Sequence, residues 1–95
     1  MAEPVFHTTY EETSLFDPKM PHRLCVWLDE TRPNRIYAED RKHMIRKRVE
    51  IKLWLEDIGW IYDVDYTINN DTFGVVDWYY FRTKAMVTMV KLAIG

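Results

Sequence analysis

The fold of this 95-residue chain is decided by residues 60–81, which are WIYDVDYTINNDTFGVVDWYYF. Side chains alternate between two faces along Trp60–Ile68, and a second apolar run covers Val75–Phe81. Alternation with a period of two is typical of half-buried strands. Between the two runs, Asn69–Gly74 is a cluster of turn-forming residues. The stretch therefore predicts an antiparallel hairpin.

The expected register of this hairpin follows from charge. Two carboxylates side by side on neighbouring strands repel, so we expect registers one residue away from the one that pairs Asp65 with Asp77. These registers give one aromatic face, in which Asp77 is the lone polar residue and needs a partner or a place at an edge. The predicted core is Trp60, Tyr62, Val64, Tyr79 and Phe81 against Met44, Ile51, Leu55, Ile58, Met86 and Met89. The predicted outer face carries Asp63, Asp65, Val76, Trp78 and Tyr80.

Helices are predicted on both sides of the hairpin. Glu39–Ile58 has acidic residues in its first turn and Gly59 just past its end. Its core stripe, at helical spacing, consists of Met44, Ile51, Leu55 and Ile58. Lys84–Ile94 is apolar except for one thin polar stripe, which is typical of a mostly buried helix. Arg23–Leu28 predicts a further strand, with Trp27 on the face opposite Leu24, Val26 and Leu28.

These elements predict an α+β fold, a two-layer sandwich with an antiparallel-rich sheet and both helices on one face. The expected order is β-α-β-β-α, which is ferredoxin-like without the last strand. Residues 21–95 are expected to form one domain. Residues 1–20 are expected to form a partly flexible N-terminal arm, in which Val5–Tyr10 is compatible with a short edge strand.

Composition narrows the function classes. The formal net charge is −2, whereas nucleic-acid-binding domains are usually basic. The single cysteine, Cys25, excludes an intramolecular disulfide and cysteine-based zinc sites. We find no phosphate-binding or nucleophile-elbow motif, and His7, His22 and His43 have no ligand-type spacing. We therefore expect no catalytic residues, no metal site and no cofactor. Cys25 is expected to be a packed side chain, and Asp63 with Asp65 a solvated strand face.

Two surfaces are candidates for partner binding. On the helix over residues 39–58, Arg41, Arg48 and Lys52 align within about 40° and could contact an acidic protein or a nucleic acid. The alternative is an ordinary solvated face with nearby carboxylates. On the outer sheet face, Trp27, Trp78 and Tyr80 form an apolar patch of the kind that marks interaction sites. The alternative there is that the N-terminal arm covers the patch.

A second apolar row on the same helix, Ile45, Val49 and Leu53, has no place against the sheet if the core stripe already lies there. It is expected either to pack on the closing helix or to form a homodimer with another copy of the chain.

The closing segment Asp77–Gly95, DWYYFRTKAMVTMVKLAIG, resembles that of small accessory proteins of tailed phages. In those proteins an aromatic strand ending in Phe-Arg leads into a helix ending in Lys-Leu, as Phe81-Arg82 and Lys91-Leu92 do here. The resemblance implies a phage-encoded factor and transfers no catalytic residue. We expect a small non-enzymatic protein that binds and modulates a host or viral protein. The alternative is a nucleic-acid-binding module that uses the basic face of helix 39–58. The N-terminus has no secretory signal, and the longest apolar stretch is too short to span a bilayer, so we expect a cytoplasmic protein, in the host cytoplasm if phage-encoded, that does not engage a membrane.

Overall fold

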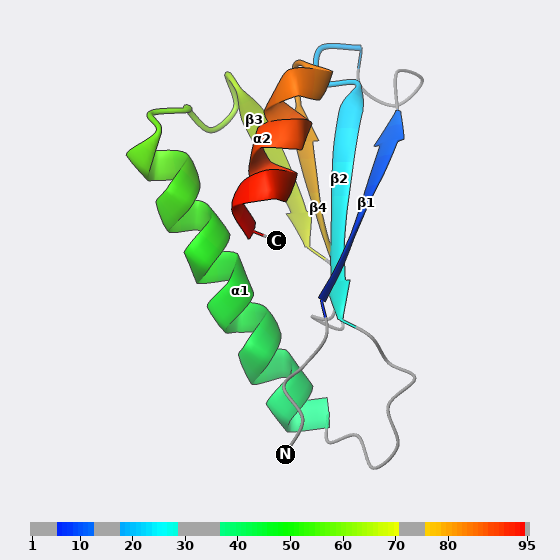
Figure 1. Cartoon of the computed structure of the whole chain (residues 1–95), viewed down its shortest axis with the longest axis vertical. Helices are drawn as coiled ribbons and strands as arrows, with labels where there is room; N and C mark the ends of the chain where they lie inside the picture. Colours follow the sequence, from blue (N-terminus) through cyan, green and yellow to red (C-terminus); the bar gives the residue numbers. More distant parts are fainter. Residues whose placement is uncertain (1–5, 13–17, 29–36, 71–75, 95) are drawn as a thin grey trace.

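The computed structural model describes residues 6–12, 18–28, 37–70 and 76–94 (Figure 1). Val5, Val75 and residues 71–74 of the predicted turn lie outside this part of the chain. The structure is an α+β fold with one four-stranded sheet and two helices. The elements in chain order are β1 (Phe6–Glu12), β2 (His22–Leu28), α1 (Tyr37–Asp57), β3 (Tyr66–Asn70), β4 (Val76–Phe81) and α2 (Lys84–Ile94).

The sheet is antiparallel throughout, with the strand order β1-β2-β4-β3. Because β2 and β3 both pair antiparallel with β4, they run parallel to each other, and α1 connects them along the chain. The expected order β-α-β-β-α is therefore incomplete, and the observed order is β-β-α-β-β-α. The difference is β1, an edge strand that pairs with β2 along its whole length and contains Phe6–Tyr10 of the segment compatible with a short edge strand.

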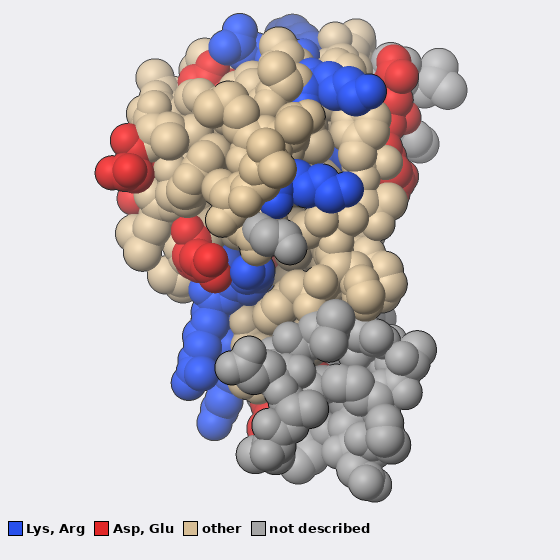
Figure 2. All heavy atoms as spheres, in the orientation of Figure 1, with Lys and Arg blue, Asp and Glu red and all other residues tan. Residues whose placement is uncertain are grey.

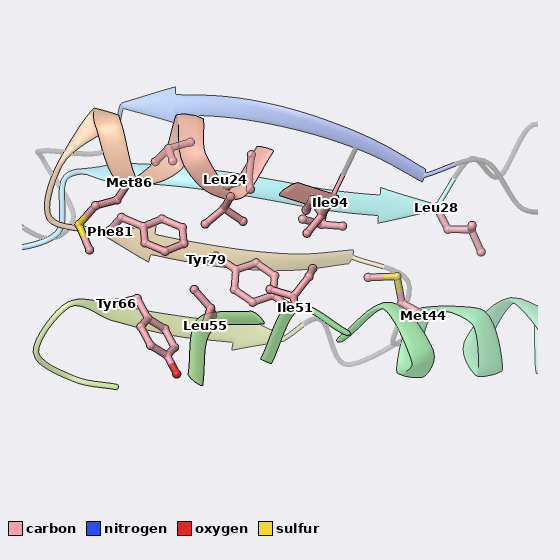
Figure 3. Packing of buried hydrophobic residues seen from close by; sticks show 13 residues of the cluster. Leu24, Leu28, Met44, Ile51, Leu55, Tyr66, Tyr79, Phe81, Met86 and Ile94 are labelled. Atoms are coloured by element: carbon pink, nitrogen blue, oxygen red, sulfur yellow. The ribbon is translucent and has the colours of Figure 1, made fainter. Parts of the chain in front are cut away.

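One face of the sheet carries the core, and both helices cover it (Figure 3). Side chains from β2 and β4 converge there with side chains from both helices, as the two-layer prediction requires. The buried residues of this core cluster are Leu24, Val26, Leu28, Tyr66, Tyr79 and Phe81 from the sheet and Met44, Ile51, Leu55, Met86, Val87, Val90 and Ile94 from the helices.

Local sequence explains where α1 ends and where α2 begins. At the end of α1, Gly59 has a φ of 84°, which a residue without a side chain adopts at little cost. Its N–H donates to the Glu56 carbonyl, and the Trp60 N–H donates to the Leu55 carbonyl, which is a Schellman motif. At the start of α2, the Thr83 hydroxyl accepts a hydrogen bond from the Met86 N–H at 3.3 Å and caps the helix.

The first strand of the predicted hairpin is shorter than expected, because β3 begins at Tyr66 and not at Trp60. The N–H groups of Val64 and Asp65 both donate to the Ile61 carbonyl, and Asp63 has a φ of 68°, so the backbone turns here. The expected register is also wrong, because Tyr66 pairs with Phe81 and Asn70 pairs with Asp77. The carboxylates of Asp65 and Asp77 are kept apart, but by a larger shift than charge alone suggested.

This turn changes the core. Tyr79, Phe81, Met44, Ile51, Leu55 and Met86 are buried as predicted. Tyr62 and Val64, predicted to be core residues, lie in or beside the turn and are 53% and 56% exposed. Trp60 and Ile58 are only partly buried, and Met89 is 49% exposed because it lies on the solvent side of α2. Tyr66 takes the buried aromatic position beside Phe81, with ring centroids 6.3 Å apart.

Candidate interaction surfaces

The six residues predicted to bind a partner fall on two separate parts of the molecule. Trp27, Trp78 and Tyr80 lie on the sheet face opposite the helices. The buried neighbours of these residues along β2 and β4 all point to the helix side, so the alternate positions point away from it. Arg41, Arg48 and Lys52 lie on α1.

The outer face of the sheet is centred on its two middle strands. Cys25 pairs with Trp78, Trp27 pairs with Val76 and Arg23 pairs with Tyr80, so these side chains form adjacent rows. No helix or strand among the described residues lies over this face, since both helices pack on the other one. Trp27, Trp78 and Tyr80 are each half-buried by their neighbours within the sheet. The prediction that they share one face is confirmed.

Contacts within the sheet hold these aromatic rings in place. The His7 and Trp27 rings lie 4.4 Å apart between centroids, and the Trp27 indole N–H donates to the Thr9 hydroxyl at 3.4 Å. At the other end of the face, Arg23 donates to the Tyr80 hydroxyl at 3.4 Å and forms an ion pair with Glu11. The hydrogen bonds to Tyr80 and to Glu11 raise the pKa of Arg23. The face is therefore a pre-ordered aromatic surface with one balanced ion pair.

Cys25 lies between these rows and is a packed side chain, as expected. It is 9% exposed, and burial raises the pKa of its thiol. A thiol with a raised pKa is mostly protonated at neutral pH and is a poor nucleophile. Cys25 therefore contributes packing to the outer face and not a reactive group.

The predicted carboxylate pair on the outer face is absent from it. Asp63 and Asp65 belong to the turn before β3, and the β3 residues paired with Tyr80 and Trp78 are Thr67 and Asn69. Asp65 accepts a hydrogen bond from the Ile61 N–H at 2.8 Å and one from Arg82 at 2.5 Å. Both contacts lower the pKa of Asp65, and the hydrogen bond from the Ile61 N–H has the larger effect. The carboxylate stabilises the turn.

Arg48 does not belong to an exposed basic stripe. Its guanidinium donates two hydrogen bonds to Asp77, from Nε at 2.9 Å and from Nη2 at 2.8 Å. The Asp77 side chain is fully buried and also accepts a hydrogen bond from the Asn70 amide at 2.7 Å. The bidentate arrangement and the third hydrogen bond satisfy a carboxylate that would otherwise be costly to bury. Asp77 thus finds the partner that its place in the core face required.

The sequence contained a signal for this pair. On a helical wheel, Arg48 lies within about 20° of Leu55, at the edge of the core stripe. An arginine at the border of a buried stripe can reach a carboxylate in the core, whereas alignment with Arg41 and Lys52 suggested a solvent-facing role. Arg41 and Lys52 are exposed.

The basic residues of α1 that remain exposed are Arg41, Lys42, Arg46 and Lys52. Figure 2 shows Lys and Arg side chains gathered along the N-terminal half of this helix. Lys47 is instead mostly covered. It donates to the Ile94 carbonyl at the end of α2 at 3.1 Å and lies 5.3 Å from the centre of the Phe6 ring. The surface is basic but depends on fewer cations than the sequence suggested.

A groove of about 370 Å³ lies between β1 and α2. Lys84 lies over the Tyr10 ring there, with Nζ 5.3 Å from the ring centre. Its lining is mostly apolar and comprises Thr8, Tyr10, Lys84, Val87, Thr88, Lys91 and Leu92. The groove is open to solvent and could accept a small apolar group.

Comparison of the chain with protein-family models, curated proteins and solved structures found no match. Within the described residues, no three His, Cys, Asp or Glu side chains gather into a set that could hold a metal ion. In the same part of the chain, no helix combines the length and the apolar character needed to cross a bilayer.

Proposed function

We propose that this is a small non-enzymatic protein that binds another protein through the outer face of its sheet. The observation that carries the proposal is the set of three aromatic side chains, Trp27, Trp78 and Tyr80, on a face that no described helix or strand covers. Tryptophan and tyrosine are the residues most enriched in interface hot spots. Their rings are already ordered by contacts within the sheet, which lowers the entropic cost of binding.

A binding role without catalysis is supported by what the reactive side chains do. The Cys25 thiol is buried, the Asp65 carboxylate stabilises a turn, and the Asp77 carboxylate is held by Arg48. Each has a structural task, and the described part of the chain brings none of them to the groove between β1 and α2.

The charge of the outer face favours a protein over a nucleic acid. Single-stranded nucleic acids bind to aromatic platforms that lie in positively charged grooves. Among the described residues, the cation on the outer face is Arg23, which is paired with Glu11. Asp63 and Asp65 lie in the turn before β3, so they do not repel phosphates at this face, but their absence adds no positive charge to it.

The second candidate is a nucleic-acid-binding module on α1. The exposed side chains of Arg41, Lys42, Arg46 and Lys52 support it, because such cations contact phosphates. The pairing of Arg48 with Asp77 weakens it, since one of the three aligned cations is directed to the core.

The resemblance of Asp77–Gly95 to closing segments of tailed-phage accessory proteins supports a biological setting for this proposal. A phage-encoded factor of this kind would act in the host cytoplasm by modulating a host or viral protein. The unpaired cysteine is compatible with that reducing compartment.

The test is affinity capture with the whole chain, followed by titration of the captured protein in purified form. Trp78→Ala should weaken binding by about tenfold or more, as loss of a hot-spot residue does. Tyr62→Ala is the matched control, because Tyr62 is an exposed aromatic residue outside the outer face. Circular dichroism establishes that both variants fold. Equal binding by both variants would exclude the outer face.

The same preparation tests the second candidate by titration with a single-stranded and a duplex oligonucleotide at low and at physiological salt. Binding that weakens steeply with salt, and that is lost in the Arg41→Glu/Lys52→Glu variant, would favour the nucleic-acid module.

A further inference from the structure

The apolar row on α1 lies in solvent. Ile45, Val49 and Leu53 are 45%, 50% and 59% exposed, so the row does not pack on α2 in the monomer. The core stripe of the same helix points to the sheet, and the row is about 150° away from that stripe on the helical wheel. Apolar side chains at successive i, i+4 positions form a continuous ridge on a helix.

The row is part of a symmetric pattern. Lys42 precedes Ile45 by three residues and Glu56 follows Leu53 by three, while Val49 is four residues from each end of the apolar row. All five side chains fall within about 80° on the helical wheel. Both Lys42 and Glu56 are exposed. The stripe, defined by these five residues, therefore has opposite charges at equal distances from Val49.

We propose that two copies of the chain associate through this stripe, with the two α1 helices antiparallel and the two-fold axis at Val49. A two-fold axis pairs a surface with itself, so each residue meets the one at the same distance on the other side of the axis. Val49 then lies against Val49 of the partner, and Ile45 lies against Leu53 of the partner. Lys42 comes level with the partner's Glu56.

Charge distinguishes this arrangement from its alternatives. In a parallel pairing, Lys42 would face the partner's Lys42 and Glu56 would face the partner's Glu56, and both contacts are repulsive. A nucleic acid would meet an acidic residue and three apolar side chains along the same stripe. In the antiparallel orientation of a second copy, each apolar residue of the stripe meets an apolar residue and each charged residue meets the opposite charge.

The stripe is short, so the contact between the two copies is small. Residues 42–56 span about 21 Å of helix, which is a small contact compared with obligate interfaces. We therefore infer a dimer that dissociates on dilution, and not a permanent one. The outer sheet face lies on the other side of each molecule and remains open in this dimer.

Cysteine cross-linking tests the geometry in a Cys25→Ala background. Val49→Cys should form a disulfide-linked dimer rapidly, because the two copies of residue 49 meet at the axis. Ile45→Cys alone should link slowly, because its two copies are about 12 Å apart along the helices and a disulfide needs Cα atoms within about 7 Å. A mixture of Ile45→Cys and Leu53→Cys chains should link to each other.

The outcomes separate the alternatives. Linking of Ile45→Cys as fast as Val49→Cys would show a parallel pairing and overturn the proposal. A chain that sediments as a monomer at hundreds of micromolar, with no rapid linking at position 49, would overturn the dimer itself.

A charge exchange gives an independent readout by sedimentation equilibrium of the full chain. Lys42→Glu and Glu56→Lys should each weaken dimerisation several-fold, because each places like charges together. The Lys42→Glu/Glu56→Lys double variant should recover affinity, since the exchanged pair is again opposite in charge. Failure of the double variant to recover would contradict the antiparallel register.

Discussion

The guanidinium of Arg48 on α1 is joined by two hydrogen bonds to the carboxylate of Asp77 in the middle of the sheet. The Asp77 side chain is fully buried, while that of Arg48 is 32% exposed. The pair links the long helix to a central strand at a point where apolar contacts are interrupted by a charge. It therefore adds a directional polar contact to the apolar packing of α1 on the sheet.

Breaking this pair should be costly, and unequally so. Arg48→Met leaves a buried carboxylate without its cation and should destabilise the protein by about 3 kcal/mol or more. Asp77→Leu leaves an arginine that can turn toward water, so its effect should be smaller. The Arg48→Met/Asp77→Leu double variant should be more stable than Arg48→Met alone. Urea unfolding of the four proteins measures the coupling, and strictly additive effects would contradict it.

The shortened β3 gives a second stability contrast. Phe81→Ala should cost about 3 to 5 kcal/mol, because the ring is fully buried. Tyr62→Ala should cost at most about 1 kcal/mol, since that ring is 53% exposed. The sequence pattern alone predicts large losses for both. Chemical denaturation of the two variants distinguishes the structure from that simpler interpretation, and a large loss for Tyr62→Ala would contradict the turn.

The elements that the sequence predicts well are those with a strong period and clear end signals. α2 has the predicted bounds, because its apolar face is nearly continuous. α1 differs from the predicted helix by two residues at its start and one at its end, where Gly59 stops it. β2 differs by one residue at its start, and β4 covers every described residue of the predicted second hairpin strand, since Val75 lies outside the described part of the chain.

The failure at residues 60–65 has a local cause. Alternation continues through this segment, but Asp65 binds the Ile61 N–H and competes with strand pairing. Aspartate is favoured in turns for this reason. Asp63 and Asp65 therefore indicate a turn, but the alternating pattern around them indicates a strand and hides that signal. The predicted hairpin register is wrong for the same reason, because it assumes a strand that starts at Trp60 and not at Tyr66.

For the candidate surfaces, too, the sequence predicts the local arrangement correctly and misses the long-range contact. Side-chain alternation placed Trp27, Trp78 and Tyr80 together, because parity along a strand depends only on local geometry. The role of Arg48 could not be derived from helix alignment, since its partner Asp77 is 29 residues away in sequence. Long-range polar pairs depend on the tertiary arrangement.

Asp65 should make stability depend on acid pH. Its pKa is lowered below the ordinary value of about 3.9 by the Ile61 N–H and by Arg82. A carboxyl with a depressed pKa in the folded state stabilises the protein above its ordinary pKa, and this contribution is lost as the pH falls through the folded pKa. Asp65→Asn should therefore lower the urea midpoint at neutral pH and leave it nearly unchanged in strong acid. A constant difference between the two proteins at all pH values would contradict this assignment.

Cys25 should be protected from modification in the folded protein. Burial limits access to the thiol and raises its pKa. Native protein should react with a disulfide reagent more than about tenfold more slowly than protein unfolded in guanidinium. Ile61→Cys in a Cys25→Ala background provides an exposed thiol as the control, because Ile61 is 60% exposed. Equal rates for native and unfolded protein would show that Cys25 is accessible.

We propose that a protein partner contacts the outer face of the sheet, with Trp78 and Tyr80 on β4. Site-specific photo-cross-linking tests this most directly. Benzoylphenylalanine is placed at position 80 on the outer face, at position 41 on the basic side of α1 and at position 62 in the exposed turn. We expect an adduct with one protein from position 80 and none from positions 41 or 62. Adducts from position 41 alone, to a protein or to a nucleic acid, would contradict it.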